Sequence, residues 1–124
     1  MSYSIEIDHV RKIVIHRHKG NIQRSELGDF WRELLAIKEF TERKYNLLTD
    51  YRKAKFSFSD EELEPVDTFL KSIKHIIDGK RNAVIVNDPD NYALTLLVGK
   101  ESAKQVNFHV NLFSTEKAAF DYLM

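Results

Sequence analysis

Residues 45–77 constrain the fold most strongly, because an apolar strand there passes through a polar segment into an amphipathic helix. The pattern predicts a strand over residues 45–51 and a loop over residues 52–59. Such a βα unit is typical of a sheet whose strand C-termini carry the loops that bind ligands or partners. The unit therefore indicates where a binding site could lie, but not which chemistry that site would perform.

The helix after this loop must be heavily buried, because its apolar residues recur with helical spacing. Gly79 is a natural C-terminal stop. Pro65 is compatible only with a first helical turn, so either the helix begins at residues 64–65 or residues 60–63 form a separate turn. The apolar stripe consists of Leu63, Val66, Leu70, Ile73 and Ile77.

Four further strands are predicted. The first two are joined by a connection of hairpin length and should be antiparallel, with Gly20 and Asn21 ending the second. The third is a continuous apolar run typical of a strand inside a sheet. In the fourth, apolar and polar residues alternate, so that one face of the strand should be exposed to solvent. These strands cover residues 4–8, 12–18, 82–87 and 106–113.

Three further helices complete a single α/β domain over residues 1–124. Ser25 is a plausible N-cap for the first, a turn at residues 88–91 precedes the second, and Ser114 or Thr115 caps the last. The helices are expected over residues 25–41, 92–104 and 116–123.

Composition excludes several classes of function. Nineteen basic residues balance nineteen acidic ones, so there is no net field to attract nucleic acid. The absence of cysteine excludes disulfides, thiolate chemistry and the common structural zinc sites, and it fits a cytoplasmic protein. No apolar run approaches the roughly 18 residues that span a bilayer, and the N-terminal residues do not resemble a signal peptide.

Three stretches together resemble the STAS superfamily of anti-sigma-factor antagonists, and more narrowly its bacterial SpoIIAA-like group. They are the strand end LLTDYR, the apolar strand AVIVND and the ending VNFHVNLFSTEKAAFDYL. The likeness covers nearly the whole chain. It implies a mixed sheet of about five strands, with about four helices mainly on one face, wound as a βα superhelix. It also implies a non-enzymatic role in binding proteins or small ligands.

In signalling members of that family, a serine at the start of the helix after the third strand is phosphorylated. The matching position here is Ser59, although no glycine follows it and no aspartate directly precedes it. Acidic residues follow, where a phosphate group would be repelled. Ser59 and Glu62 have capping-box spacing, so we favour a role of Ser59 as a helix cap over a phosphorylation site.

The segment around that serine is the expected contact region for a protein partner, because it combines basic and aromatic side chains after a strand end. The alternative is that the two phenylalanines turn inward and close the core, since apolar patches are seldom left open. The residues proposed for partner binding are Asp50, Arg52, Lys53, Phe56, Phe58 and Ser59.

Two other groups of polar residues have a functional and a structural interpretation. His16 and His18 share a strand face and could ligate a metal, but without a third ligand we favour ordinary histidines on a wet face, as for His109. Asp50 and Asp88 could meet at one sheet edge and bind a cation, but turn chemistry at Asp88 and pairing of Asp50 with nearby Arg52 explain them better.

No motif supports catalysis. The sequence has no Gly-x-Ser-x-Gly, no glycine-rich phosphate loop and no His-Glu-x-x-His, so no enzyme activity, metal or cofactor is expected. The surplus of aromatic and aliphatic residues in a small chain leaves one alternative function open. A small apolar ligand, such as a lipid, could bind between sheet and helices, as in Sec14-like domains.

Overall fold

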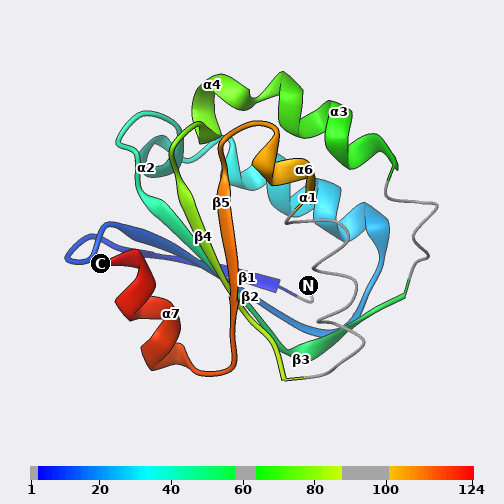
Figure 1. Cartoon of the computed structure of the whole chain (residues 1–124). Helices are drawn as coiled ribbons and strands as arrows, with labels where there is room; N and C mark the ends of the chain where they lie inside the picture. The colour runs from blue at the N-terminus through cyan, green and yellow to red at the C-terminus, as the bar shows by residue number, and fades with distance from the viewer. Residues whose placement is uncertain (1–2, 58–63, 88–100) are drawn as a thin grey trace.

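Five strands form one mixed sheet in the order β1-β2-β3-β4-β5 in the computed structural model, which describes residues 3–57, 64–87 and 101–124 (Figure 1). The first two strands form the expected antiparallel hairpin, and each later pair of neighbours is parallel. The strands are β1 (Tyr3–Asp8), β2 (Ile13–Ile22), β3 (Asn46–Phe56), β4 (Arg81–Ile85) and β5 (His109–Phe113).

Helices cover the two faces of the sheet unequally, as expected for this fold (Figure 1). α7 (Glu116–Leu123) packs on one face and has the predicted bounds, with the Thr115 side chain accepting a hydrogen bond from the N–H of Ala118. The helices on the other face are α1 (Arg24–Leu34), α2 (Lys38–Thr41), α3 (Glu64–Ser72), α4 (Lys74–Ile77) and α6 (Glu101–Lys104).

Each face of the sheet has its own apolar core, because alternate strand residues point to opposite sides. The larger core lies between the sheet and the helices α1, α2, α3, α4 and α6. It includes Val14, Phe30, Leu34, Phe40, Leu47, Leu70, Ile73, Ile77, Val84 and Val110. The smaller core lies under α7 and consists of Ile13, Ile15, Leu48, Ala83, Ile85, Ala119 and Leu123.

Two predicted helices are each divided into two shorter ones. The helix expected over residues 25–41 breaks where Ile37 adopts an extended backbone, so that Phe40 on α2 becomes fully buried. The second break lies at Ile73, between α3 and α4. The described part of α3 runs from Glu64 to Ser72. Residues 60–63 lie outside the described residues, so the choice between a helix start at residues 64–65 and a separate turn at residues 60–63 stays a prediction. Gly79 follows α4 with a φ of +83°.

β2 and β3 are longer than the sequence predicts. Gly20 has a φ of +76° and the register shifts between Arg17 and Lys19, so the chain passes through an irregularity and continues pairing instead of ending the strand. The prediction of a loop over residues 52–59 is therefore wrong for residues 52–56, which continue β3 and pair with β2 as far as Phe56.

Candidate functional site

Asp50 is buried on the α7 face of the sheet, at the last position where β3 pairs with β4. Its carboxylate accepts hydrogen bonds from Arg17 Nη1 at 2.7 Å, Arg52 Nη2 at 2.8 Å and Arg52 Nε at 3.0 Å. The backbone N–H of Arg52 donates a fourth bond at 3.0 Å. The predicted pairing of Asp50 with Arg52 is thus confirmed, and each of these four hydrogen bonds is donated to the carboxylate.

Arg17 extends this cluster to α7. Its Nη2 donates to Glu116 Oε1 at 2.7 Å, and Arg52 Nη2 lies 3.7 Å from Glu116 Oε2. Two guanidinium groups and two carboxylates, Arg17, Asp50, Arg52 and Glu116, therefore form what we call the ion-pair network. Sequence reasoning missed Arg17 and Glu116, although Arg17 shares a strand face with the apolar residues under α7.

The network keeps Asp50 ionised. Burial alone would raise the pKa of this carboxyl group, but the hydrogen bonds and charge of Arg52, together with the hydrogen bond from Arg17, lower the pKa below its usual value. The hydrogen bond to Glu116 raises the pKa of Arg17. A carboxylate held by two guanidinium groups is a poor proton acceptor, so the arrangement anchors α7 to the sheet rather than providing an acid or base.

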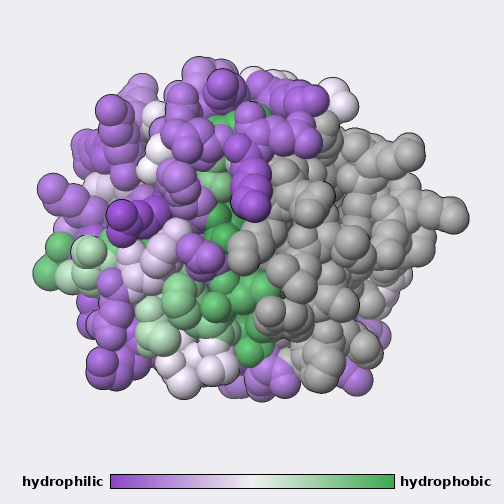
Figure 2. All heavy atoms as spheres, in the orientation of Figure 1, coloured by the Kyte–Doolittle hydropathy of each residue, from purple (hydrophilic) through white to green (hydrophobic). Residues whose placement is uncertain are grey.

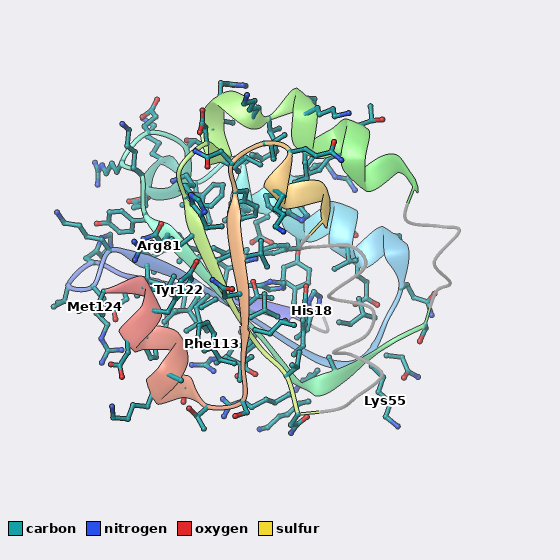
Figure 3. All side chains as sticks on the ribbon, in the orientation of Figure 1. His18, Lys55, Arg81, Phe113, Tyr122 and Met124 are labelled. Carbon is teal, nitrogen blue, oxygen red and sulfur yellow. The ribbon has the colours of Figure 1, made fainter. Side chains whose placement is uncertain are left out.

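Lys53 and Lys55 lie on the part of β3 that extends past β4. β4 pairs β3 only as far as Asp50, while β2 continues beside β3, with Lys19 opposite Lys53 and Asn21 opposite Lys55. We call residues 19–22 and 53–56 the β2–β3 ribbon. The three lysines are exposed, and none of them forms an ion pair with a described residue. Figure 3 shows the side chain of Lys55 extending outward from the end of β3.

The remaining predicted contact residues are only partly described. Phe56 ends β3 with its backbone paired to Ile22, whereas Phe58 and Ser59 lie outside the described residues, as does Asp88. The choice between cap and phosphorylation site at Ser59, the orientation of the two phenylalanines and the meeting of Asp50 with Asp88 therefore stay predictions.

His16 and His18 are buried, so the prediction that they lie on a wet strand face is wrong. Their side chains point into the larger core, because α1 packs over this part of β2: the His16 ring stacks on Phe30 at 3.4 Å between centroids. Tyr3 and Tyr51 provide further ring contacts, and the centroids of the two imidazole rings lie 4.5 Å apart. His109, by contrast, is exposed as predicted.

All four ring nitrogens of His16 and His18 are buried without a hydrogen-bond partner among the described residues. His18 Nε2 lies 4.0 Å from Glu26 Oε2, beyond hydrogen-bond distance. Burial, with the neighbouring His18 as a second cause, lowers the pKa of His16 well below 6.5, and burial lowers the pKa of His18 to about 4. Both rings are therefore neutral at pH 7, and we call them the histidine pair.

Lys80 is a further buried charge that the sequence did not reveal. Its Nζ donates to the carbonyl oxygen of Tyr45 at 2.9 Å and lies 4.5 Å from the centroid of the Phe40 ring. Burial lowers its pKa to about 8. The contacts tie the start of β4 to α2 and to the residue before β3, which is a structural role.

Among the described residues, no group of three or more histidine or acidic side chains is arranged to hold a metal ion. No helix in that part of the chain is both long and apolar enough to cross a membrane.

Comparisons with known proteins give a fold but no activity. No protein-family model and no curated protein match this sequence. A solved structure does match: an uncharacterised protein of the DUF3478 family from Shewanella loihica PV-4, described as having a SpoIIAA-like fold. The match covers 99% of this chain and 94% of that one, with a TM-score of 0.61 and 15% identity. The expected fold is thereby confirmed: the chain has a SpoIIAA-like fold.

Proposed function

We propose that this chain is a non-enzymatic interaction module that binds a protein partner through the β2–β3 ribbon. The observation that carries the proposal is the position of Lys19, Lys53 and Lys55, which are exposed beyond β4 without an ion pair to a described residue. Lysines held close together on one ribbon fit an acidic surface, because opposite potentials attract and orient the two proteins.

The residues expected to contact the partner divide into two roles. Asp50 and Arg52 are committed to the ion-pair network and hold β3 against β2 and α7. Lys53 and Lys55 lie just beyond that anchored point and are free to meet another molecule. A ribbon held in place before binding loses little conformational freedom on association, which favours affinity.

The chemistry of the described polar residues supports binding rather than catalysis. A general base must reach the proton that it removes and must not already be saturated with donors. Asp50 already accepts four hydrogen bonds and so does not meet this requirement. The STAS-like resemblance of the sequence and the SpoIIAA-like fold are in keeping with a partner-binding role.

Charge reversal on the ribbon tests this proposal. A variant with Lys53→Glu and Lys55→Glu should lose the partner that the wild type retains in affinity capture from the cell of origin. The matched control carries Lys74→Glu and Lys104→Glu, an identical change of charge on exposed residues of α4 and α6. Capture by the control but not by the ribbon variant supports the proposal, and equal capture by both variants places the contact surface elsewhere.

The histidine pair favours a second candidate function, binding of a small ligand with an apolar body and a polar head. Four unpartnered ring nitrogens beside aromatic side chains offer donors and acceptors that such a head could satisfy. Native mass spectrometry of freshly purified protein tests this candidate. A bound mass that disappears in the His16→Phe variant supports it, and a spectrum of the bare chain alone contradicts it.

A further inference from the structure

The sheet has two edges, and only one of them is protected by charge. Proteins commonly block edge strands with charged residues, because the unpaired backbone groups there can pair with another chain. β1 carries Glu6 and Asp8. β5, with the sequence HVNLF, carries no acidic residue, lysine, arginine or proline.

The outer side of β5 presents a defined set of backbone groups. The N–H of His109 bonds to Lys80 O and the carbonyl of Phe113 accepts from Val86 N, so both residues point their backbone groups toward β4. Because successive strand residues alternate, the N–H and carbonyl groups of Val110 and Leu112 point away from β4. Within the described residues, nothing bonds to these four groups.

Apolar side chains flank this edge on both faces of the sheet. Leu112 is half-buried against the larger core and Phe113 against the smaller one. Figure 2 shows the resulting hydrophobic area in the middle of the face that β5 crosses in Figure 1, next to α7. The edge thus combines unpaired backbone groups with partly exposed apolar side chains, the combination that favours strand addition.

We propose that a second copy of this chain occupies the edge, with β5 pairing antiparallel to β5 of the partner about a twofold axis at Asn111. This register is self-complementary: Val110 of each copy lies opposite Leu112 of the other, and the four outward groups of each copy form four hydrogen bonds across the axis. The net charge of zero means that two copies do not repel each other.

A cysteine at the axis tests the register directly, because the natural chain contains no cysteine. Asn111 would face its own copy in a non-hydrogen-bonded pair, with Cα atoms about 4.5 Å apart, which is within disulfide range. Ser114, the matched control, would lie about 20 Å from its copy, at about 3.3 Å per residue over six residues. Mild oxidation should therefore link Asn111→Cys into dimers but not Ser114→Cys.

Charge repulsion at the same position provides an independent test that needs no cross-link. Asn111→Lys should place two like charges next to each other and weaken dimerisation by about tenfold or more in sedimentation equilibrium. Ser114→Lys should leave the dissociation constant unchanged, and circular dichroism should show that both variants keep the fold. A wild type that is monomeric at all accessible concentrations would overturn the proposal, as would equal cross-linking of the two cysteine variants.

Discussion

His16 and Arg17 are consecutive residues on β2, yet they enter opposite environments. Arg17 points toward α7, lies opposite Asp50 on β3 and has a partner for each guanidinium Nη. His16 points toward α1 and lies opposite Thr49, and no residue in the described part of the chain bonds to either of its ring nitrogens. The network therefore depends on keeping its charges, whereas the histidine pair depends on being uncharged.

Solvent explains why both arrangements occur in one sheet. The Arg17 side chain is 38% exposed and that of Glu116 is 41% exposed, so water still solvates part of the network and charge separation costs little there. His16 is fully buried and His18 is 3% exposed, so a proton on either ring would meet a large desolvation cost. The comparison shows that charge is kept on the face under α7, where water and ion-pair partners reach the side chains, and is not kept by the histidines buried on the face under α1.

A fall in pH should have the largest effect on the stability of the protein, because the histidine pair is neutral in the folded state and takes up protons on unfolding. The folded pKa of each histidine lies below its unfolded value of about 6.5, so the unfolded state binds protons first as pH falls. Stability is complete above about pH 6.5 and falls toward pH 4, by at most about 1.4 kcal/mol per histidine per pH unit. Urea unfolding at a series of pH values measures this loss.

A variant with both histidines replaced, His16→Phe and His18→Phe, provides the control for this experiment. Its free energy of unfolding should stay nearly constant between about pH 6.5 and pH 4. It should fall only below about pH 4, where protonation of Asp50 begins to break the ion-pair network. An identical pH profile for wild type and double variant would show that the histidine pair does not control acid stability.

Removing the acceptor at the centre of the network should have the next largest effect. Asp50→Ala leaves two adjacent guanidinium groups with Glu116 as their shared partner. We expect a loss of about 2 to 3 kcal/mol in the free energy of unfolding, just below the range for a fully buried ion pair because water reaches the arginines. Asp50→Asn, which keeps the shape and one acceptor, should lose less in the same urea titration.

Replacing one member of the histidine pair should stabilise the protein at pH 7. His16→Phe removes two buried nitrogens that lack partners and keeps a flat ring against Phe30. We expect a gain of about 1 kcal/mol, because an apolar group of similar shape avoids the cost of unsatisfied polar atoms. Thermal denaturation measures it, with exposed His75→Phe as the control that should show no gain. A destabilised His16→Phe variant would point to an unseen partner for the imidazole.

The smallest effect is expected at the exposed end of the network. Glu116→Gln removes one charge that is partly hydrated, so the loss in the free energy of unfolding should be below about 1 kcal/mol. The exposed pair of Lys117 and Asp121 on the same helix offers a comparison, since Asp121→Asn should change stability even less. A loss at Glu116 as large as that at Asp50 would mean that the network acts as one buried unit.

Local sequence patterns determined much of the secondary structure of this protein. The antiparallel hairpin, the interior strand at residues 82–87, the stop at Gly79 and the helix of residues 116–123 were all predicted from periodicity, turn residues and caps. These features depend on side chains close in sequence, which is why a single chain reveals them. The pairing of Asp50 with Arg52 was predictable for the same reason.

Only the tertiary structure decided what the polar residues do. The polar pattern of β2 suggested a wet face for His16 and His18, but α1 covers that face and removes the solvent. Arg17 and Glu116 are 99 residues apart and meet because α7 packs on the face of the sheet to which Arg17 points. Local propensity cannot report such distant contacts, because burial and charge pairing are properties of the packed chain rather than of any segment.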